Sequence, residues 1–134
     1  MELKKSYAGL VWWIAIFTAV LLALCFVRIE DEGLIIRLIC AEMNLGVAGL
    51  AYMIYRNEAV YWYNGTEYEE AVAAGSERRK AFAKKHLDRF ALCAAATVLY
   101  SAAAQGLGWP FWIDIVLSTV ALIAAAISTM KFKL

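Results

Sequence analysis

Four polar side chains interrupt the apolar stretches of this chain and are the first candidates for chemistry. Arg37, Glu42 and Asn44 lie within one stretch, and Asp114 lies within another. A charge left alone in hydrocarbon costs at least ~2.5–3.5 kcal/mol, so charged residues there are usually paired or functional. Arg37 and Asp114 each lie three residues from the start of their stretch, at similar depth. We expect them to form an ion pair, with either a structural role or that of an outer constriction.

Glu42 lies deeper, eight residues from the start of its stretch, which is about 12 Å at ~1.5 Å per residue. On a helix it shares a face with Gly46 and Gly49, opposite the face that carries Arg37 and Asn44. A carboxyl group near mid-membrane is a candidate proton carrier or cation site. The alternative is a protonated glutamic acid hydrogen-bonded across a helix interface, for example to Asn44 of a neighbouring helix.

Other polar residues in the apolar stretches are weaker candidates. Tyr100, Gln105 and Ser118 are interpreted either as lining the same space as Glu42 or as simple packing residues. The chain has no nucleophile–base spacing, no cluster of metal ligands and a single histidine, His86. The sequence therefore predicts no catalytic residues, no metal site, no cofactor and no enzyme activity.

Four apolar stretches must position these side chains, and they span about residues 7–27, 34–55, 90–107 and 111–130. Hydrophobic residues make up 63% of the 134 residues, well above a soluble domain. Each stretch is close to the ~20 residues that a helix needs to cross a bilayer. We predict an all-α fold, a bundle of four transmembrane helices forming a single integral membrane domain over residues 1–134.

The distribution of basic residues predicts the orientation. All but two of the 13 lysines and arginines, Arg28 and Arg37, lie on the side that holds both termini and the connector 56–89. Because basic residues concentrate in cytoplasmic loops, both termini are predicted to be cytoplasmic. A net charge of +1 argues against nucleic acid as a partner and leaves the lipid bilayer as the expected environment.

The connector is predicted to fold into two short helices. Thr66 and Glu69 fit a capping box that begins an acidic helix ending at Ala74, and Ser76 can cap a second, basic helix that leads into the third span. His86 is expected to be solvated. The basic helix is expected to present a cytoplasmic surface that attracts anionic headgroups, or simply to reflect ordinary membrane topology. The residues of this surface are Arg78, Arg79, Lys80, Lys84 and Lys85.

Several segments resemble small multi-pass membrane proteins of Gram-positive bacteria. The resemblance lies in residues 61–66 (YWYNGT), 76–80 (SERRK), 86–90 (HLDRF) and 109–114 (WPFWID), and it covers about half of the chain. No activity is assigned to that group. The resemblance therefore implies only a multi-pass protein of the bacterial plasma (inner) membrane.

Two functions are consistent with this pattern. The first is a homo-oligomeric transporter or channel-like protein in which Glu42 is the membrane-embedded carboxyl group. Self-association is expected because four spans in one chain barely enclose a solute pathway. The alternative is a non-catalytic membrane partner, such as an immunity, regulatory or accessory subunit. That protein would bind a partner on the cytoplasmic side through the connector.

Overall fold

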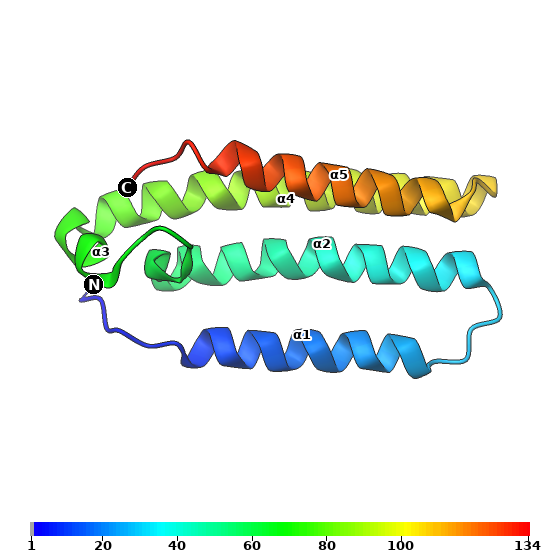
Figure 1. The fold of residues 1–134 in the computed structure, drawn as a ribbon, viewed down its shortest axis with the longest axis horizontal. Coiled ribbons are helices and arrows are strands. Elements are labelled where there is room, and N and C mark those ends of the chain that lie inside the picture. Colours follow the sequence, from blue (N-terminus) through cyan, green and yellow to red (C-terminus); the bar gives the residue numbers. More distant parts are fainter. Residues whose placement is uncertain (1) are drawn as a thin grey trace.

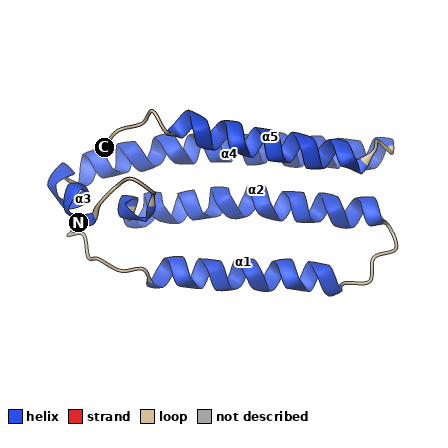
Figure 2. Cartoon of the chain, in the orientation of Figure 1, coloured by secondary structure: helices blue, strands red, loops and turns tan. Residues whose placement is uncertain are grey.

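The computed structural model describes residues 2–134, and within this range the regular structure is entirely helical (Figure 2). The elements are α1 (Ala8–Phe26), α2 (Glu32–Asn57), the 3-10 helix η1 (Val60–Trp62), α3 (Tyr68–Ala74), α4 (Ser76–Leu107) and α5 (Phe111–Thr129). The helices α1, α2, α4 and α5 are long and apolar enough to cross a membrane. The prediction of four apolar helices is therefore confirmed, and their bounds differ from the predicted ones mainly at α4.

The four long helices lie side by side, with α2 between α1 and the pair formed by α4 and α5 (Figure 1). Residues of α2 are buried against α4 and α5, whereas no residue of α1 is buried. The arrangement thus differs from an evenly packed four-helix bundle. It is a three-helix core of α2, α4 and α5, with α1 attached along the free side of α2.

The helix α4 contains both the predicted basic helix and the third span into which that helix was expected to lead. It runs without a break for 32 residues, which is about 48 Å at ~1.5 Å per residue. No glycine or proline lies between Gly75 and Gly106, so nothing interrupts the helix where it leaves the apolar stretch. Since a hydrocarbon core is about 30 Å thick, the first turns of α4 extend beyond the membrane-spanning part.

The connector and both chain ends meet at one end of the molecule (Figure 1). A cluster of buried residues forms there around Ile54, Val60, Tyr61 and Phe82. The Tyr61 hydroxyl donates to the Ser6 carbonyl oxygen at 2.7 Å, which holds the segment before α1 against η1. We call this region, residues 58–82 with the chain ends packed on it, the connector cap.

Both predicted helix caps of the connector differ in the structure. Ser76 is the first residue of α4 instead of its N-cap, and no side chain caps this helix start. The helix α3 begins after Glu67, and the Glu70 carboxylate accepts from the Glu67 backbone N–H, so the predicted box at Thr66 is displaced by one residue. The helix α2 ends at Asn57, and its C-cap residue Glu58 adopts the left-handed conformation (φ 56°). A non-glycine residue in this region is strained, and it is retained here because the Glu58 side chain is fixed by buried partners described below.

Candidate functional site

Arg37 and Asp114 form the predicted ion pair, buried between α2 and α5. Arg37 Nε donates to Asp114 Oδ1 at 3.2 Å, and both side chains are almost completely inaccessible. The Ser101 hydroxyl of α4 donates to the other carboxylate oxygen, Asp114 Oδ2, at 2.6 Å. Asp114 thus has partners on both oxygens, which offsets the large cost of burying a charge.

The two terminal nitrogens of Arg37 also donate hydrogen bonds. Its Nη1 donates to Gln105 Oε1, and its Nη2 donates to the Trp109 carbonyl oxygen. Gln105 in turn donates from Nε2 to Asp31 Oδ2 at 2.9 Å. That bond, with the backbone N–H of Leu34, holds the pKa of Asp31 below its usual value. The cluster therefore joins α2, α4, α5 and the loop before α2 through satisfied hydrogen bonds.

Asn44 faces the interior of the three-helix core. Cys93 Sγ of α4 donates to Asn44 Oδ1 at 3.3 Å, and Asn44 Nδ2 donates to the Cys40 carbonyl oxygen at 3.0 Å. Ser118 of α5 is buried nearby, and Asn44 and Ser118 line a cavity of about 230 Å³. Asn44 is satisfied within its own chain.

Glu42 lies on the opposite side of α2, in a groove between α1 and α2. The groove has a volume of about 460 Å³. Both carboxyl oxygens of Glu42 are buried and have no hydrogen-bond partner. In residues 2–134 the only other buried side-chain oxygen or nitrogen without a partner is the Tyr63 hydroxyl. The groove walls are otherwise apolar and include Trp13, Ile16, Phe17, Val20, Leu38 and Leu45.

Gly46 allows α1 to approach α2 beside Glu42. The Trp13 indole N–H donates to the Gly46 carbonyl oxygen at 3.1 Å, and the rings of Trp13 and Phe17 stack with centroids 5.0 Å apart. A Cβ at position 46 would lie 2.5 Å from Phe17 Cε2, closer than real side chains come. By contrast, a Cβ at Gly49 would meet nothing within 4 Å. Helix α1 therefore covers the part of this α2 face that holds Glu42 and Gly46.

The structure separates the candidate residues into two groups. Arg37, Asn44, Asp114, Gln105 and Ser118 belong to the three-helix core, and none of them lines the groove at Glu42. The ring of Tyr100 packs near that of Trp109, with centroids 6.0 Å apart, and Tyr100 does not line the groove either. The expectation that Tyr100, Gln105 and Ser118 share a space with Glu42 is not met.

A second buried ion pair, which sequence reasoning missed, lies in the connector cap. Arg79 donates to Glu58 Oε2 from Nη2 at 2.8 Å and from Nε at 3.1 Å, and Arg79 Nη1 donates to the Ala71 carbonyl oxygen at 2.9 Å. The Ser76 hydroxyl donates to Glu58 Oε1, and Lys80 Nζ lies 3.6 Å from the same oxygen. Glu58 is 0% exposed and Arg79 only 3%.

These contacts correct the expected surface role of Arg79 and set the charge state of Glu58. Burial alone would raise the pKa of Glu58, but the Ser76 and Arg79 hydrogen bonds and the charges of Arg79 and Lys80 together lower it. The signal in the sequence was a lone acidic residue following the second span. Its partner, however, lies 21 positions away and could not be identified from helical spacing.

His86 also differs from its expected solvated position. It is buried, its Nδ1 lies 3.0 Å from the Phe82 carbonyl oxygen, and its ring stacks on Tyr63 with centroids 4.2 Å apart. The remaining members of the predicted basic surface, Arg78, Lys80, Lys84 and Lys85, are exposed. A packing role accounts for each contact that His86 makes.

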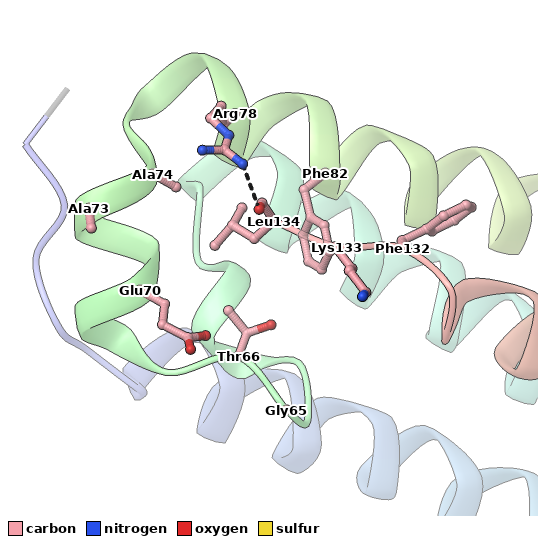
Figure 3. A pocket seen from close by; sticks show the side chains of 10 residues that line it. All are labelled: Gly65, Thr66, Glu70, Ala73, Ala74, Arg78, Phe82, Phe132, Lys133 and Leu134. Atoms are coloured by element: carbon pink, nitrogen blue, oxygen red, sulfur yellow. Dashed lines mark hydrogen bonds between the residues drawn. The ribbon is translucent and has the colours of Figure 1, made fainter.

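A concave surface of about 470 Å³ lies on the connector cap beside the end of the chain (Figure 3). Arg78 extends across it, and its Nη2 donates to the Leu134 carbonyl oxygen at 2.8 Å. Glu70 and Lys133 also line it, so charges of both signs face this hollow (Figure 3).

The fold and these sites define the class of the molecule, a small multi-pass helical membrane protein. In residues 2–134 no group of three or more His, Cys, Asp or Glu residues is placed to hold a metal ion. Comparisons with protein-family models, with curated proteins and with solved structures each found no match.

Proposed function

We propose that the protein is a homo-oligomeric transporter or channel-like protein in which Glu42 binds and releases a proton or another cation. One observation carries this proposal: both Glu42 oxygens are buried in the membrane-spanning part of α2 without a hydrogen-bond partner. An unpaired carboxyl group in hydrocarbon is expensive, and such residues usually mark an ion or proton pathway.

The other intramembrane charges do not offer such a site. The three nitrogens of Arg37 and both oxygens of Asp114 already have partners within the chain. A solute that bound there would have to break those bonds. We therefore assign the Arg37–Asp114 cluster a structural role, and we assign ion binding to Glu42 alone.

A pathway at Glu42 requires a second copy of the chain. The groove is walled by α1 and α2 only, and the helices α4 and α5 lie on the far side of α2 (Figure 1). Helix α1 has no buried residue, and Gly49 on the same α2 face is exposed. A second copy packed over this face would enclose Glu42. In this proposal the connector cap faces the cytoplasm of a bacterium, in line with the concentration of lysine and arginine at that end.

Proton flux in proteoliposomes tests the proposal. We expect a wild-type flux driven by a membrane potential that Glu42→Gln abolishes, because the amide retains the shape of the side chain but cannot exchange a proton. Glu69→Gln, an exposed carboxylate of α3, is the matched control and should leave the flux unchanged. Equal flux through the wild type and Glu42→Gln would refute the proposal.

A second candidate function has one observation in its favour. The connector is a folded cap with the hollow of Figure 3, and Arg78, Glu70 and Lys133 present charges of both signs in it. A non-catalytic subunit that docks through this surface would need such a fixed shape. Co-purification of a membrane protein with the wild type tests this function. If that protein no longer co-purifies with Arg78→Ala but still co-purifies with Glu42→Gln, docking through this surface is favoured.

A further inference from the structure

We propose that the groove between α1 and α2 binds a lipophilic organic cation carrying a single positive charge, with Glu42 as its counter-ion. This inference rests on the proposed function, because it names the class of cation that Glu42 would exchange. Three features of the groove lead to it: its one carboxyl group, its apolar walls and its stacked aromatic rings.

The charge of the ligand follows from Glu42. Its two oxygens are the unpartnered polar atoms in the groove, and no other titratable side chain lines the groove from α1 or from α2. One carboxylate neutralises one positive charge, so a doubly charged ligand would remain unbalanced in hydrocarbon. An anion would be repelled.

The apolar walls argue against a metal cation as the ligand of the groove. Metal cations need several oxygen ligands in place of their water shell, and no other acidic, histidine or cysteine side chain is among the residues that line the groove with Glu42. The remaining lining residues, such as Ile16, Val20 and Leu38, offer only hydrocarbon. An organic cation brings its own apolar surface and needs no such ligands. The volume of about 460 Å³ lies within the roughly 300–1,000 Å³ of small-molecule sites.

Two aromatic residues strengthen the preference for an organic cation. Trp13 and Phe17 line the groove and stack on each other, which fixes both rings. Aromatic faces attract cations through the ring quadrupole, most strongly where water is excluded. Because both walls belong to membrane-spanning helices, a ligand would enter sideways from the bilayer. Only a lipophilic cation partitions there.

Equilibrium dialysis of the purified protein in detergent at pH 8 tests the inference, with tetraphenylphosphonium as the probe. Tetraphenylborate has nearly the same shape and the opposite charge, so it controls for partitioning into the apolar groove. We expect saturable binding of the cation only. Binding should weaken at least about tenfold in Glu42→Gln, and it should weaken as the pH falls because protons compete for the same carboxyl group.

A second pair of variants covers the case in which Glu42→Gln does not fold. Phe17→Leu keeps an apolar side chain and removes one ring, and we expect affinity to fall about three- to tenfold. Phe26→Leu changes a phenylalanine of the same helix that is 82% exposed, and it should bind like the wild type. Absence of saturable tetraphenylphosphonium binding, equal binding by Glu42→Gln, or equal binding of tetraphenylborate would overturn the inference.

The two proposals fail in different experiments. If Glu42-dependent proton flux is present but tetraphenylphosphonium does not bind, the ligand class is wrong and the proposed function stands. If tetraphenylphosphonium binds through Glu42 but wild-type proteoliposomes show no flux, the binding site stands and transport is refuted.

Discussion

The two flanks of α2 provide opposite environments for a buried carboxyl group. On the flank facing α4 and α5, Asp114 is held by Arg37 and Ser101, and every charge has a partner. On the flank facing α1, Glu42 has no partner at all. A buried polar group that is fully bonded stabilises one packing, whereas an unbonded one reduces stability and is retained for another reason. The contrast separates the structural flank of this protein from the flank that we assign to function.

The largest effect is expected from removing one half of the Arg37–Asp114 pair. Asp114→Ala leaves the Arg37 guanidinium buried without its carboxylate, and we expect a loss of about 3–5 kcal/mol in the free energy of unfolding. Denaturant unfolding in mixed micelles, followed by circular dichroism, measures it. Asp88→Ala is the control because Asp88 forms only an exposed ion pair with Lys84, and exposed ion pairs contribute little to stability. Similar losses for both variants would remove the distinction between the flanks.

Acid should weaken the connector cap through Glu58. Its pKa is lowered in the folded protein, so the ionised form stabilises the fold above the unfolded-state pKa, and this contribution disappears as pH falls through the lowered folded value. We expect wild-type stability to decrease below about pH 4.5 and Glu58→Gln to show a flatter pH profile. Unfolding measured between pH 3 and 7 tests this. A profile unchanged by Glu58→Gln would show that the buried pair does not control acid stability.

A smaller effect is expected at the contact between α1 and α2. Gly46→Ala forces the Phe17 ring away from α2, because the new Cβ would otherwise lie 2.5 Å from it. We expect a loss of about 1 kcal/mol, at the low end for overpacking because Phe17 is only half-buried. Gly49→Ala places the same methyl group where no atom of its own chain lies within 4 Å, so it should leave the contact between α1 and α2 unchanged. If the two variants behave alike, α1 does not pack at Gly46 as described.

The smallest effect on stability is expected at Glu42 itself. Glu42→Gln breaks no hydrogen bond, so the free energy of unfolding should change by less than about 1 kcal/mol in either direction. The same unfolding assay measures it, beside the flux assay. A loss as large as that of Asp114→Ala would mean that Glu42 has a structural partner, and the contrast between the flanks would then fail.

Much of the fold was accessible from periodicity and charge. The lengths of the apolar stretches predicted four spans. The similar depth of Arg37 and Asp114 in their spans predicted that they pair, and the structure confirms both predictions. Both follow from local rules that hold along a single helix. The unbroken α4 was also within reach, because no helix breaker lies between Gly75 and Gly106.

The remaining features depend on how segments fold back on each other. The Glu58–Arg79 pair requires the left-handed turn at Glu58 and the return of the chain through α3, and neither has a signal in helical spacing. For Glu42, the helical face could be predicted, but the helix that covers this face could not. The face of α1 that packs on Glu42 has no polar residue that would mark it in the sequence. The contact between α1 and α2 is seen only in the structure, from their close approach at Gly46.

The length of α4 has a mechanical consequence. The helix is continuous over 32 residues and about 48 Å long. If it tilted as one body by about 10° about its outer end, Ser76 at the other end would move sideways by about 8 Å. Ser76 and Arg79 hold the far end of α2 through Glu58. A tilt of α4 as one body near Gln105 would therefore also move the Glu58 contacts at the other end of the helix.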